Sequence, residues 1–193
     1  AGMDASNLVT RGAGAAWSTG TNSFRTTGFQ NNGIATSNTD YFQVTLSATP
    51  GNVLNLSTID ARFAGTASYC ASPGVTMQFA YSLDGTTFTL IGSPQTLIGT
   101  PSTLTQIDVT GISALQNVSD ATTVYLRYYA SGQTTTGGWG FYSPAASAYG
   151  LAIGGSITPA CTAPTTQASA FSSSSVSNFS GTVNWVRGNG TAG

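Results

Sequence analysis

The chain has 193 residues, enough for one domain of ordinary size with a remnant, or for two small domains. Charged residues make up 6% of it, against roughly 25% in an average soluble domain, and the sequence contains no Lys, Glu or His. Catalytic triads that use His, zinc sites ligated by His and acid–base pairs that use Glu are therefore excluded. The composition predicts a protein that is not an enzyme.

The charge balance also limits the expected partners. Five Arg and six Asp give a formal net charge of -1, so the chain lacks the cationic cluster that neutralises the phosphates of nucleic acid. No stretch approaches the ~18 uninterrupted apolar residues of a membrane span, so membrane insertion is not expected. The first residue is Ala rather than Met, so we expect either that a leader has been removed or that the chain was excised from something longer; both favour export to the cell surface or the extracellular space.

Alternation of apolar and polar residues with a period of two dominates the chain, and no segment longer than ten residues has helical apolar spacing. The clearest predicted strands cover residues 40–48, 53–63, 75–83, 86–91, 103–109, 122–130 and 148–157. Pro50-Gly51 predicts a type II turn between the first two, and Asp84-Gly85 predicts a hairpin between the third and fourth. We expect an all-β fold in which two antiparallel sheets pack as a jelly-roll-like β-sandwich.

The amino-acid composition of the chain changes after Ile157. Two prolines and several small residues over residues 158–165 predict an extended linker, so the sandwich should occupy residues 1–157. Residues 166–193 contain a serine run and then a period-two segment in which Phe179, Val183 and Trp185 share one face. About 30 residues cannot bury enough apolar surface to fold alone, so this segment should pair with the preceding sandwich or with another chain.

Several stretches of the first domain resemble a known family. Residues 16–20, residues 38–46 and residues 81–88, with an S-x-DG-x-x-F pattern, are similar to the jelly-roll modules of large exported surface proteins of Bacteroidota. The resemblance covers most of the chain, but its motifs are turn and core features. It implies secretion by a type IX route, in adhesins, matrix proteins or accessory modules of enzymes, and fold-level likeness does not decide among these.

The end of the chain resembles a second family. Residues 164–169 and 183–190 look like the opening of the fibronectin type III-like repeats that often follow such modules, and Trp185 would match their buried Trp. A complete module of that kind needs about seven strands, whereas only about two are present here. The resemblance therefore implies an incomplete domain that a partner completes, such as a neighbouring subunit or an adjacent domain of a larger protein.

A glycine-rich segment contains Trp139, Phe141 and Tyr142, which are candidates for carbohydrate binding. Flat aromatic rings stack on the apolar C–H faces of sugars, and neighbouring hydroxyl and amide groups bind the sugar hydroxyls. In the alternative interpretation, these rings close one end of the core. We favour that alternative, because large aromatic side chains are mostly buried.

Tyr125, Arg127 and Tyr129 alternate with apolar residues and should line the outer face of their strand. An Arg between two Tyr could dock a neighbouring subunit or bind a carboxylated sugar. The alternative is a ladder of cation–π contacts within one sheet. The interface and the ladder remain open at this point.

Two cysteines and the scattered Asp residues complete the candidates. Cys70 and Cys161 cannot form a metal site with four ligands, so a disulfide or two inert thiols remain. Calcium prefers several carboxylates close together, and no D-x-D-x-D-G loop occurs. No cofactor is expected, and a structural calcium ion is the minority alternative. The Asp residues that raise it are Asp40, Asp60, Asp84, Asp108 and Asp120.

Two functions of different classes fit this sequence. The first is a non-enzymatic extracellular structural or adhesive protein, a subunit or repeat of a surface fibre or layer that assembles by strand addition. Its interface would include Phe179, Val183 and Trp185. The alternative is a carbohydrate-binding module that holds a larger secreted enzyme or adhesin on polysaccharide, with the Trp139 segment as its platform. A weaker third option is a piece of an enzyme whose catalytic domain lies outside this chain.

Overall fold

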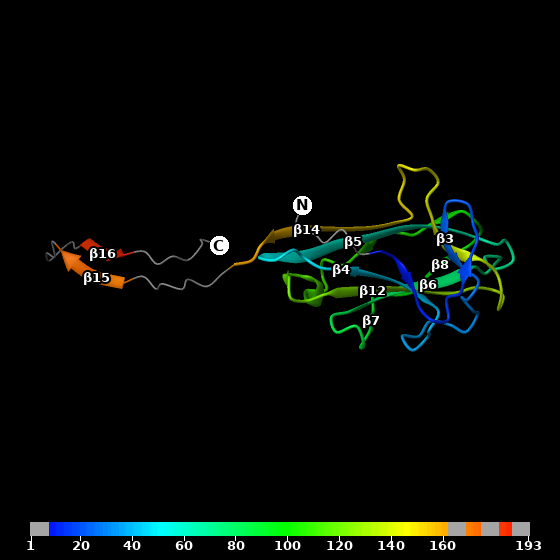
Figure 1. The fold of residues 1–193 in the computed structure, drawn as a ribbon, viewed down its shortest axis with the longest axis horizontal. Helices are drawn as coiled ribbons and strands as arrows, with labels where there is room; N and C mark the ends of the chain where they lie inside the picture. The colour runs from blue at the N-terminus through cyan, green and yellow to red at the C-terminus, as the bar shows by residue number, and fades with distance from the viewer. Residues whose placement is uncertain (1–7, 162–168, 175–181, 187–193) are drawn as a thin grey trace. The chain divides into compact units, whose positions relative to one another are not determined.

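The computed structural model describes residues 8–161, 169–174 and 182–186, and it describes side chains over residues 8–161. The chain divides into two compact units, residues 1–158 and 159–193. The described part contains sixteen strands, one short 3-10 helix and no α-helix. Two antiparallel sheets pack as a sandwich, which confirms the predicted all-β class (Figure 1).

The first sheet has six strands in the order β1-β4-β12-β6-β7, with β8 also paired to β6. Its long central strand β12 pairs antiparallel with β4 on one side and with β6 on the other. The strand bounds are β1 Thr10–Arg11, β4 Tyr41–Leu46, β6 Val75–Ser82, β7 Thr89–Leu90, β8 Gln95–Leu97 and β12 Val124–Ser131. The strands at both ends of this sheet are therefore only two residues long.

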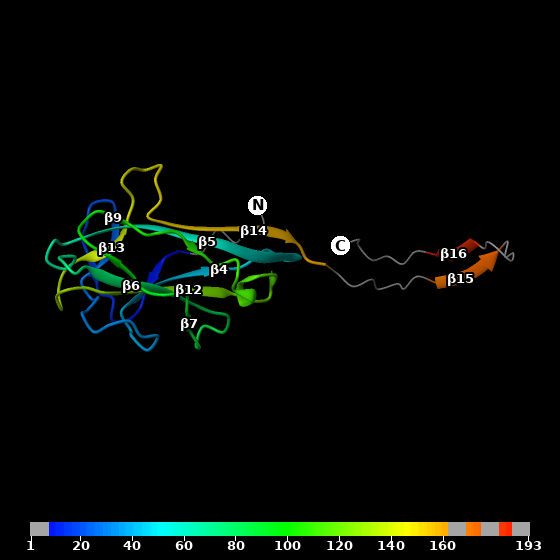
Figure 2. The same cartoon turned by 180° about the vertical axis from the view of Figure 1, so that it is seen from behind.

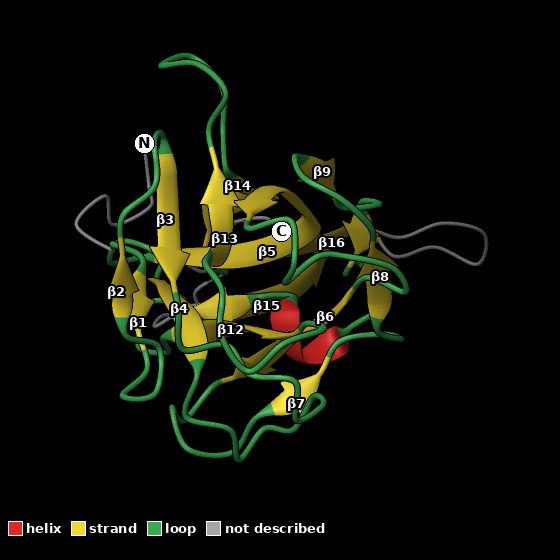
Figure 3. Ribbon diagram, turned by 90° about the vertical axis from the view of Figure 1, so that its right-hand side faces the viewer, coloured by secondary structure: helices red, strands yellow, loops and turns green. Residues whose placement is uncertain are grey.

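The second sheet has eight strands and is organised along β5, which has fourteen residues. Its order is β10-β5-β13-β3-β2, and β9, β11 and β14 also pair with β5. The bounds are β2 Trp17–Ser18, β3 Ser23–Thr26, β5 Asn52–Gly65, β9 Ser102–Thr103, β10 Ile107–Asp108, β11 Val118–Ser119, β13 Trp139–Tyr142 and β14 Leu151–Pro159. A 3-10 turn over Ser113–Leu115 lies between β10 and β11. Seen from one end, β3, β13 and β5 form one layer and β4, β12 and β6 the other (Figure 3).

Aromatic rings from both sheets meet in the core. Tyr128 of the first sheet stacks on Phe63 of the second with ring centroids 5.0 Å apart, and Phe42 lies 5.5 Å from Phe141. In the predicted strands, the period of two places one row of apolar side chains inward, and most members of three such rows are buried: Phe42, Leu46, Val75, Met77, Phe79, Val124, Leu126 and Tyr128. Val44 and Tyr81 are only partly buried. So are Leu151 and Ile153 of the last predicted strand, whose Tyr149 is 41% exposed. Such ring pairs contribute about 0.5–1.5 kcal/mol each beyond the area that they bury.

Both predicted turns are present. Gly51 has φ of 79°, which a type II turn requires at its third position, and Asn52 N donates to Thr49 O at 3.1 Å. This turn connects β4 to β5 and so carries the chain from one sheet to the other. After β6, Gly85 has φ of 74° and β7 returns antiparallel to β6, so the hairpin is confirmed. Its loop covers residues 83–88 and is longer than a two-residue turn.

Short strands are the main departure from the predicted elements. The strand expected over residues 103–109 is two separate strands, β9 and β10, and the one expected over residues 86–91 shrinks to β7. Six further strands of the two large sheets were not predicted: β1, β2, β3, β8, β11 and β13. Each has two to four residues, which is too short for a period of two to be recognised.

The second unit contains one hairpin, in which β15 (Ser169–Ser174) pairs antiparallel with β16 (Thr182–Val186). Ser173 is paired with Val183, and the register shifts between Ser169 and Ser172. The period-two segment thus finds one strand partner within its own unit, which corrects the expectation that it depends wholly on a sheet elsewhere. Among the described residues these two strands pair only with each other. Phe179 and the side chains of Val183 and Trp185 lie outside what the structure describes.

Candidate functional site

Trp139 is part of the core and is not a surface platform. Its side chain is 0% exposed, and its ring stacks on Phe63 with centroids 5.5 Å apart and planes 9° apart. Its indole Nε1 donates to the hydroxyl of Tyr128 at 2.7 Å. Phe141 is buried as well, and only Tyr142, at the end of β13, is partly exposed. The sugar-platform hypothesis at Trp139 and Phe141 is therefore wrong, and the core interpretation that the sequence favoured is confirmed for these two rings, since β13 lies between β5 and β3 and both rings are buried.

The Arg127 side chain makes the cation–π ladder that was one of the two open interpretations. Its guanidinium carbon lies 3.8 Å from the ring centroid of Tyr41 and 3.6 Å from that of Phe88. Its Nε donates to Gln43 Oε1 at 2.9 Å, across the pair of β12 and β4. These contacts engage the guanidinium within its own chain, and Tyr125 is partly exposed beside it.

Tyr129 lies on the outer face of β12 as predicted, on the same side as Arg127, but it is not exposed there. It is fully buried, its ring lies edge-on to Tyr41, and its hydroxyl donates to Thr36 O at 3.2 Å. Burial raises the pKa of this phenol above its ordinary value. Alternation along β12 therefore holds at Tyr129, and the side chain is buried because the loop that contains Thr36 lies over this part of the outer face.

Both cysteines are free, so the disulfide considered from the sequence is not formed. Cys70 is buried at the end of the turn that follows β5, and its Sγ donates to Thr66 O at 3.1 Å. Burial raises the pKa of this thiol, which keeps it protonated and unreactive at neutral pH. Cys161 is exposed.

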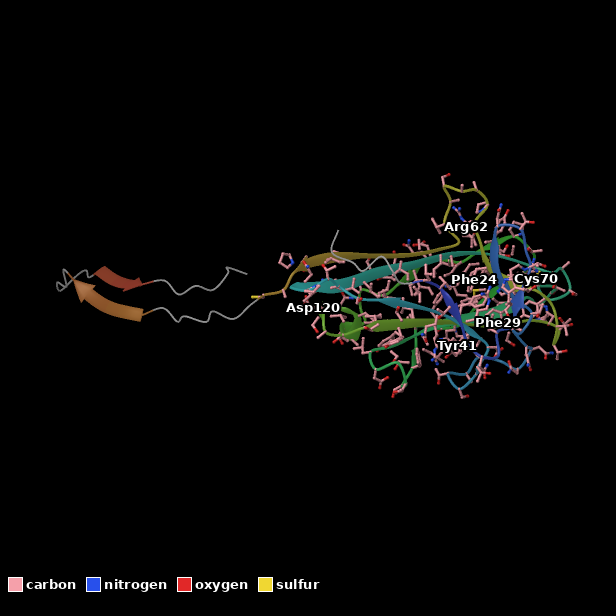
Figure 4. All side chains as sticks on the ribbon, in the orientation of Figure 1. Phe24, Phe29, Tyr41, Arg62, Cys70 and Asp120 are labelled. Carbon is pink, nitrogen blue, oxygen red and sulfur yellow. The ribbon has the colours of Figure 1, made fainter. Side chains whose placement is uncertain are left out.

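The described Asp residues serve local structure and do not gather at one site. Cys70, whose thiol is another possible metal ligand, is also far from Asp120: the two residues lie at opposite ends of the sandwich (Figure 4). Among residues 8–161 no group of three or more ligating side chains could hold a metal ion. Their acceptor roles are as follows: Asp40 accepts from Gln30 N, Asp60 from Gln106 Nε2, Asp84 from Thr86 N and Thr87 N, Asp108 from Thr110 N, and Asp120 from Gly51 N.

Trp17 is the exposed tryptophan that the sequence interpretation overlooked. It begins β2, the last strand of the second sheet, and 69% of its side chain is exposed. With the following turn it lines a hollow of about 480 Å³, whose other residues are Ser18, Thr19, Gly20, Thr21 and Ser23. The signal was present as a Trp followed by small hydroxyl residues, but only a short edge hairpin brings that run to the surface.

β14 provides a second candidate surface. It has nine residues and runs beside β5 (Figure 2), and among the described residues it pairs with no other strand. It contains no ionisable side chain. Beside its start lies a mainly apolar hollow of about 470 Å³, whose lining includes Val9, Phe24, Phe141 and Leu151.

Comparison with protein-family models and with curated proteins found no match for this chain. Within the described residues, no helix has both the length and the apolar character needed to cross a membrane. Among the described residues, two surfaces have the chemistry of a binding site: the edge of β14 and the hollow at Trp17.

Proposed function

We propose that this protein is a non-enzymatic structural or adhesive module, exported to the cell surface or the extracellular space, and that copies of it join by strand pairing. The observation that carries the proposal is the edge of β14. Its nine residues include no ionisable group, and it pairs with β5 alone among the described strands. Such an edge presents a row of backbone donors and acceptors to another chain.

The other sheet ends differ from β14. The terminal strands β1, β7, β10 and β2 have two residues each, which is one way in which proteins prevent unwanted edge pairing. On β14 the usual protective features, such as Lys or an inward charge, are missing, and Pro159 stands only at its last position. A long, uncharged edge that is kept in an otherwise well-terminated sandwich favours a role in assembly.

The hairpin of the second unit is the proposed partner of this edge, supplied by a neighbouring copy. An isolated two-stranded hairpin is only marginally stable in water, and β15 and β16 each have an edge without a partner among the described residues. Pairing with β14 would satisfy these backbone groups. Because hairpin and edge are different surfaces of one chain, the contact is head-to-tail and propagates into a fibre or layer.

The apolar hollow beside β14 supports the same arrangement. A strand added at this edge would bring alternate side chains toward Leu151 and Phe141, which line that hollow. Apolar side chains inserted there would gain roughly 25 cal/mol for each Å² removed from water. Backbone pairing would then supply affinity, and the hollow would select the register.

Sedimentation velocity of the full chain over a range of concentrations tests the proposal, with Ser156→Lys as the variant. Ser156 is exposed on β14, and a Lys there is a natural means of blocking edge pairing. Ser93→Lys, in an exposed loop after β7, adds the same charge elsewhere. We expect association of the wild type and of Ser93→Lys, and monomers for Ser156→Lys. A wild type that stays monomeric at every concentration would overturn the proposal.

Truncation after residue 164 tests the role of the hairpin. The remaining chain keeps all of the first unit, so circular dichroism and thermal unfolding should match those of the full chain. We expect this truncated chain to be monomeric and to compete with the full chain for hairpins. Persistent assembly of the truncated chain would show that β14 accepts something other than the hairpin.

A further inference from the structure

We propose that the hollow at Trp17 binds a neutral sugar ring of a polysaccharide, a function that goes beyond self-assembly. The carbohydrate hypothesis built on Trp139 fails because that ring is buried. Trp17 meets the same chemical requirement at the surface: an accessible indole face beside several hydroxyl groups.

The exposure of Trp17 sets it apart from the other aromatic rings. Among residues 8–161 only Trp17 and Tyr149 are large exposed aromatics. The ring of Tyr149 is covered in part by the guanidinium of Arg62, 4.6 Å from its centroid. Trp17 makes no ring or cation contact within that same part of the chain. An uncovered indole is available to stack on the apolar face of a ligand.

The turn after Trp17 is held by its own hydrogen bonds, so the hollow is preformed. Ser23 N donates to Gly20 O at 3.3 Å, and Ser23 Oγ donates to Thr21 O at 2.9 Å. Asn22 takes a positive φ of 55°, which closes the turn into β3. A Cβ atom at Gly20 would lie 2.3 Å from Arg25 Cδ, so glycine lets the turn lie directly on the Arg25 side chain.

The lining of the hollow indicates the class of ligand. Thr19 and Thr21 are exposed, and their hydroxyl groups make no hydrogen bond within the described residues, so they are free to bind sugar hydroxyls. Among the described residues no charged side chain lines the hollow, which favours a neutral sugar over an acidic one. Its volume of about 480 Å³ falls within the roughly 300–1,000 Å³ that is common for ligand sites.

Affinity electrophoresis of the full chain tests this inference. Native gels would contain xylan, mannan, galactan or mixed-linkage β-glucan as neutral polymers, and alginate as an acidic one. We expect at least one neutral polymer to retard the wild type, and Trp17→Ala to weaken that binding by about tenfold, as for the loss of one aromatic contact. Trp17→Phe, which keeps a flat ring, should retain part of the affinity.

Two further variants separate stacking from polar recognition. Replacing both Thr19 and Thr21 by Val keeps their shapes and removes their hydroxyls, so we expect weaker retardation with an unchanged fold. Ile98→Ala is the matched control, because Ile98 is also exposed, at 64%, but lies outside the hollow. It should leave retardation unchanged.

Three results would overturn the inference: no retardation by any neutral polymer, equal retardation of Trp17→Ala and wild type, or retardation by alginate alone. A loss of self-association in Trp17→Ala without any loss of retardation would instead assign Trp17 to a subunit contact. Sedimentation reports on the β14 edge and retardation on the Trp17 hollow. Failure of one proposal is therefore distinguishable from failure of the other.

Discussion

Trp17 and Trp139 belong to one row of the second sheet, yet their surroundings are opposite. Both are paired with Thr26, Trp17 from β2 and Trp139 from β13. Trp139 lies on the inner strand, stacked on Phe63 and hydrogen-bonded to Tyr128, whereas Trp17 lies on the terminal strand and is 69% exposed. Position within a sheet, more than local sequence, decides whether a ring supports the core or is available for binding.

The largest expected effect on the free energy of unfolding comes from removing the buried ring of Trp139. Trp139→Ala removes a fully buried indole and should lower the free energy of unfolding by about 3–5 kcal/mol. Chemical denaturation followed by far-UV circular dichroism measures this change. A loss below about 1 kcal/mol would mean that the sandwich does not depend on this ring, and the contrast between the two tryptophans would disappear.

A smaller effect should follow from removing the partner of the Trp139 indole. Tyr128→Phe keeps the ring and deletes the hydroxyl that accepts from Trp139 Nε1. The buried N–H would then lack an acceptor, at a cost of about 1–3 kcal/mol in the free energy of unfolding. Burial keeps the pKa of Tyr128 well above its usual value, so the loss should be the same at pH 6 and pH 8. If Tyr128→Phe leaves the free energy of unfolding unchanged, the hydrogen bond is dispensable.

The periphery is stabilised by turns, and Asp84 makes that contribution dependent on pH. Hydrogen bonds from Thr87 N, Thr86 N and Ser82 Oγ hold the pKa of its carboxyl well below the ordinary value. The folded state therefore binds a proton less readily than the unfolded state, so this stabilisation is present above about pH 4 and is lost as the pH falls further.

Asp84→Asn provides the comparison. We expect the wild type to exceed the variant in free energy of unfolding at pH 7, and the difference to shrink as the pH falls from about 5 to 2. Urea denaturation at several pH values measures both chains under matched conditions. A difference that stays constant with pH would refute the assignment to this carboxylate.

The smallest effect is expected at the terminal position of the row. Trp17→Ala removes a ring that is mostly in water, so the free energy of unfolding should change by no more than about 0.5 kcal/mol. Measured beside Trp139→Ala in the same denaturant series, it gives the contrast directly. A loss comparable to that of Trp139→Ala would place Trp17 in the core and remove the basis for the sugar site.

The sequence was most informative where the strands are long. Periodicity predicted the rows of Phe42, Val75 and Val124, and Gly51 and Gly85 marked turns that need positive φ. It was least informative for strands of two to four residues, which exist because a longer neighbour pairs with them. The burial of Tyr129 likewise depends on a segment distant in the chain, since Thr36 accepts its hydroxyl hydrogen bond.

The sequence indicated which types of surface to look for, but it placed them on the wrong residues. The pattern of an aromatic ring among glycines and hydroxyl residues fits both the Trp139 and the Trp17 segments, and nothing local distinguishes an inner strand from a terminal one. The assembly surface shows the same difficulty. Residues 166–193 suggested an unpaired strand, whereas β16 already pairs with β15, and the long uncharged edge is on β14.

Hydrogen exchange of the full chain at low and high concentration tests the proposed assembly most directly. If neighbouring copies pair along β14, amides in residues 151–159 will exchange more slowly at high concentration, together with those of β15 and β16, while the inner strand β6 will not change. Ser156→Lys should remove this concentration dependence. Exchange along residues 151–159 that is the same at both concentrations, in a sample that sedimentation shows to be associated, would contradict strand pairing at this edge.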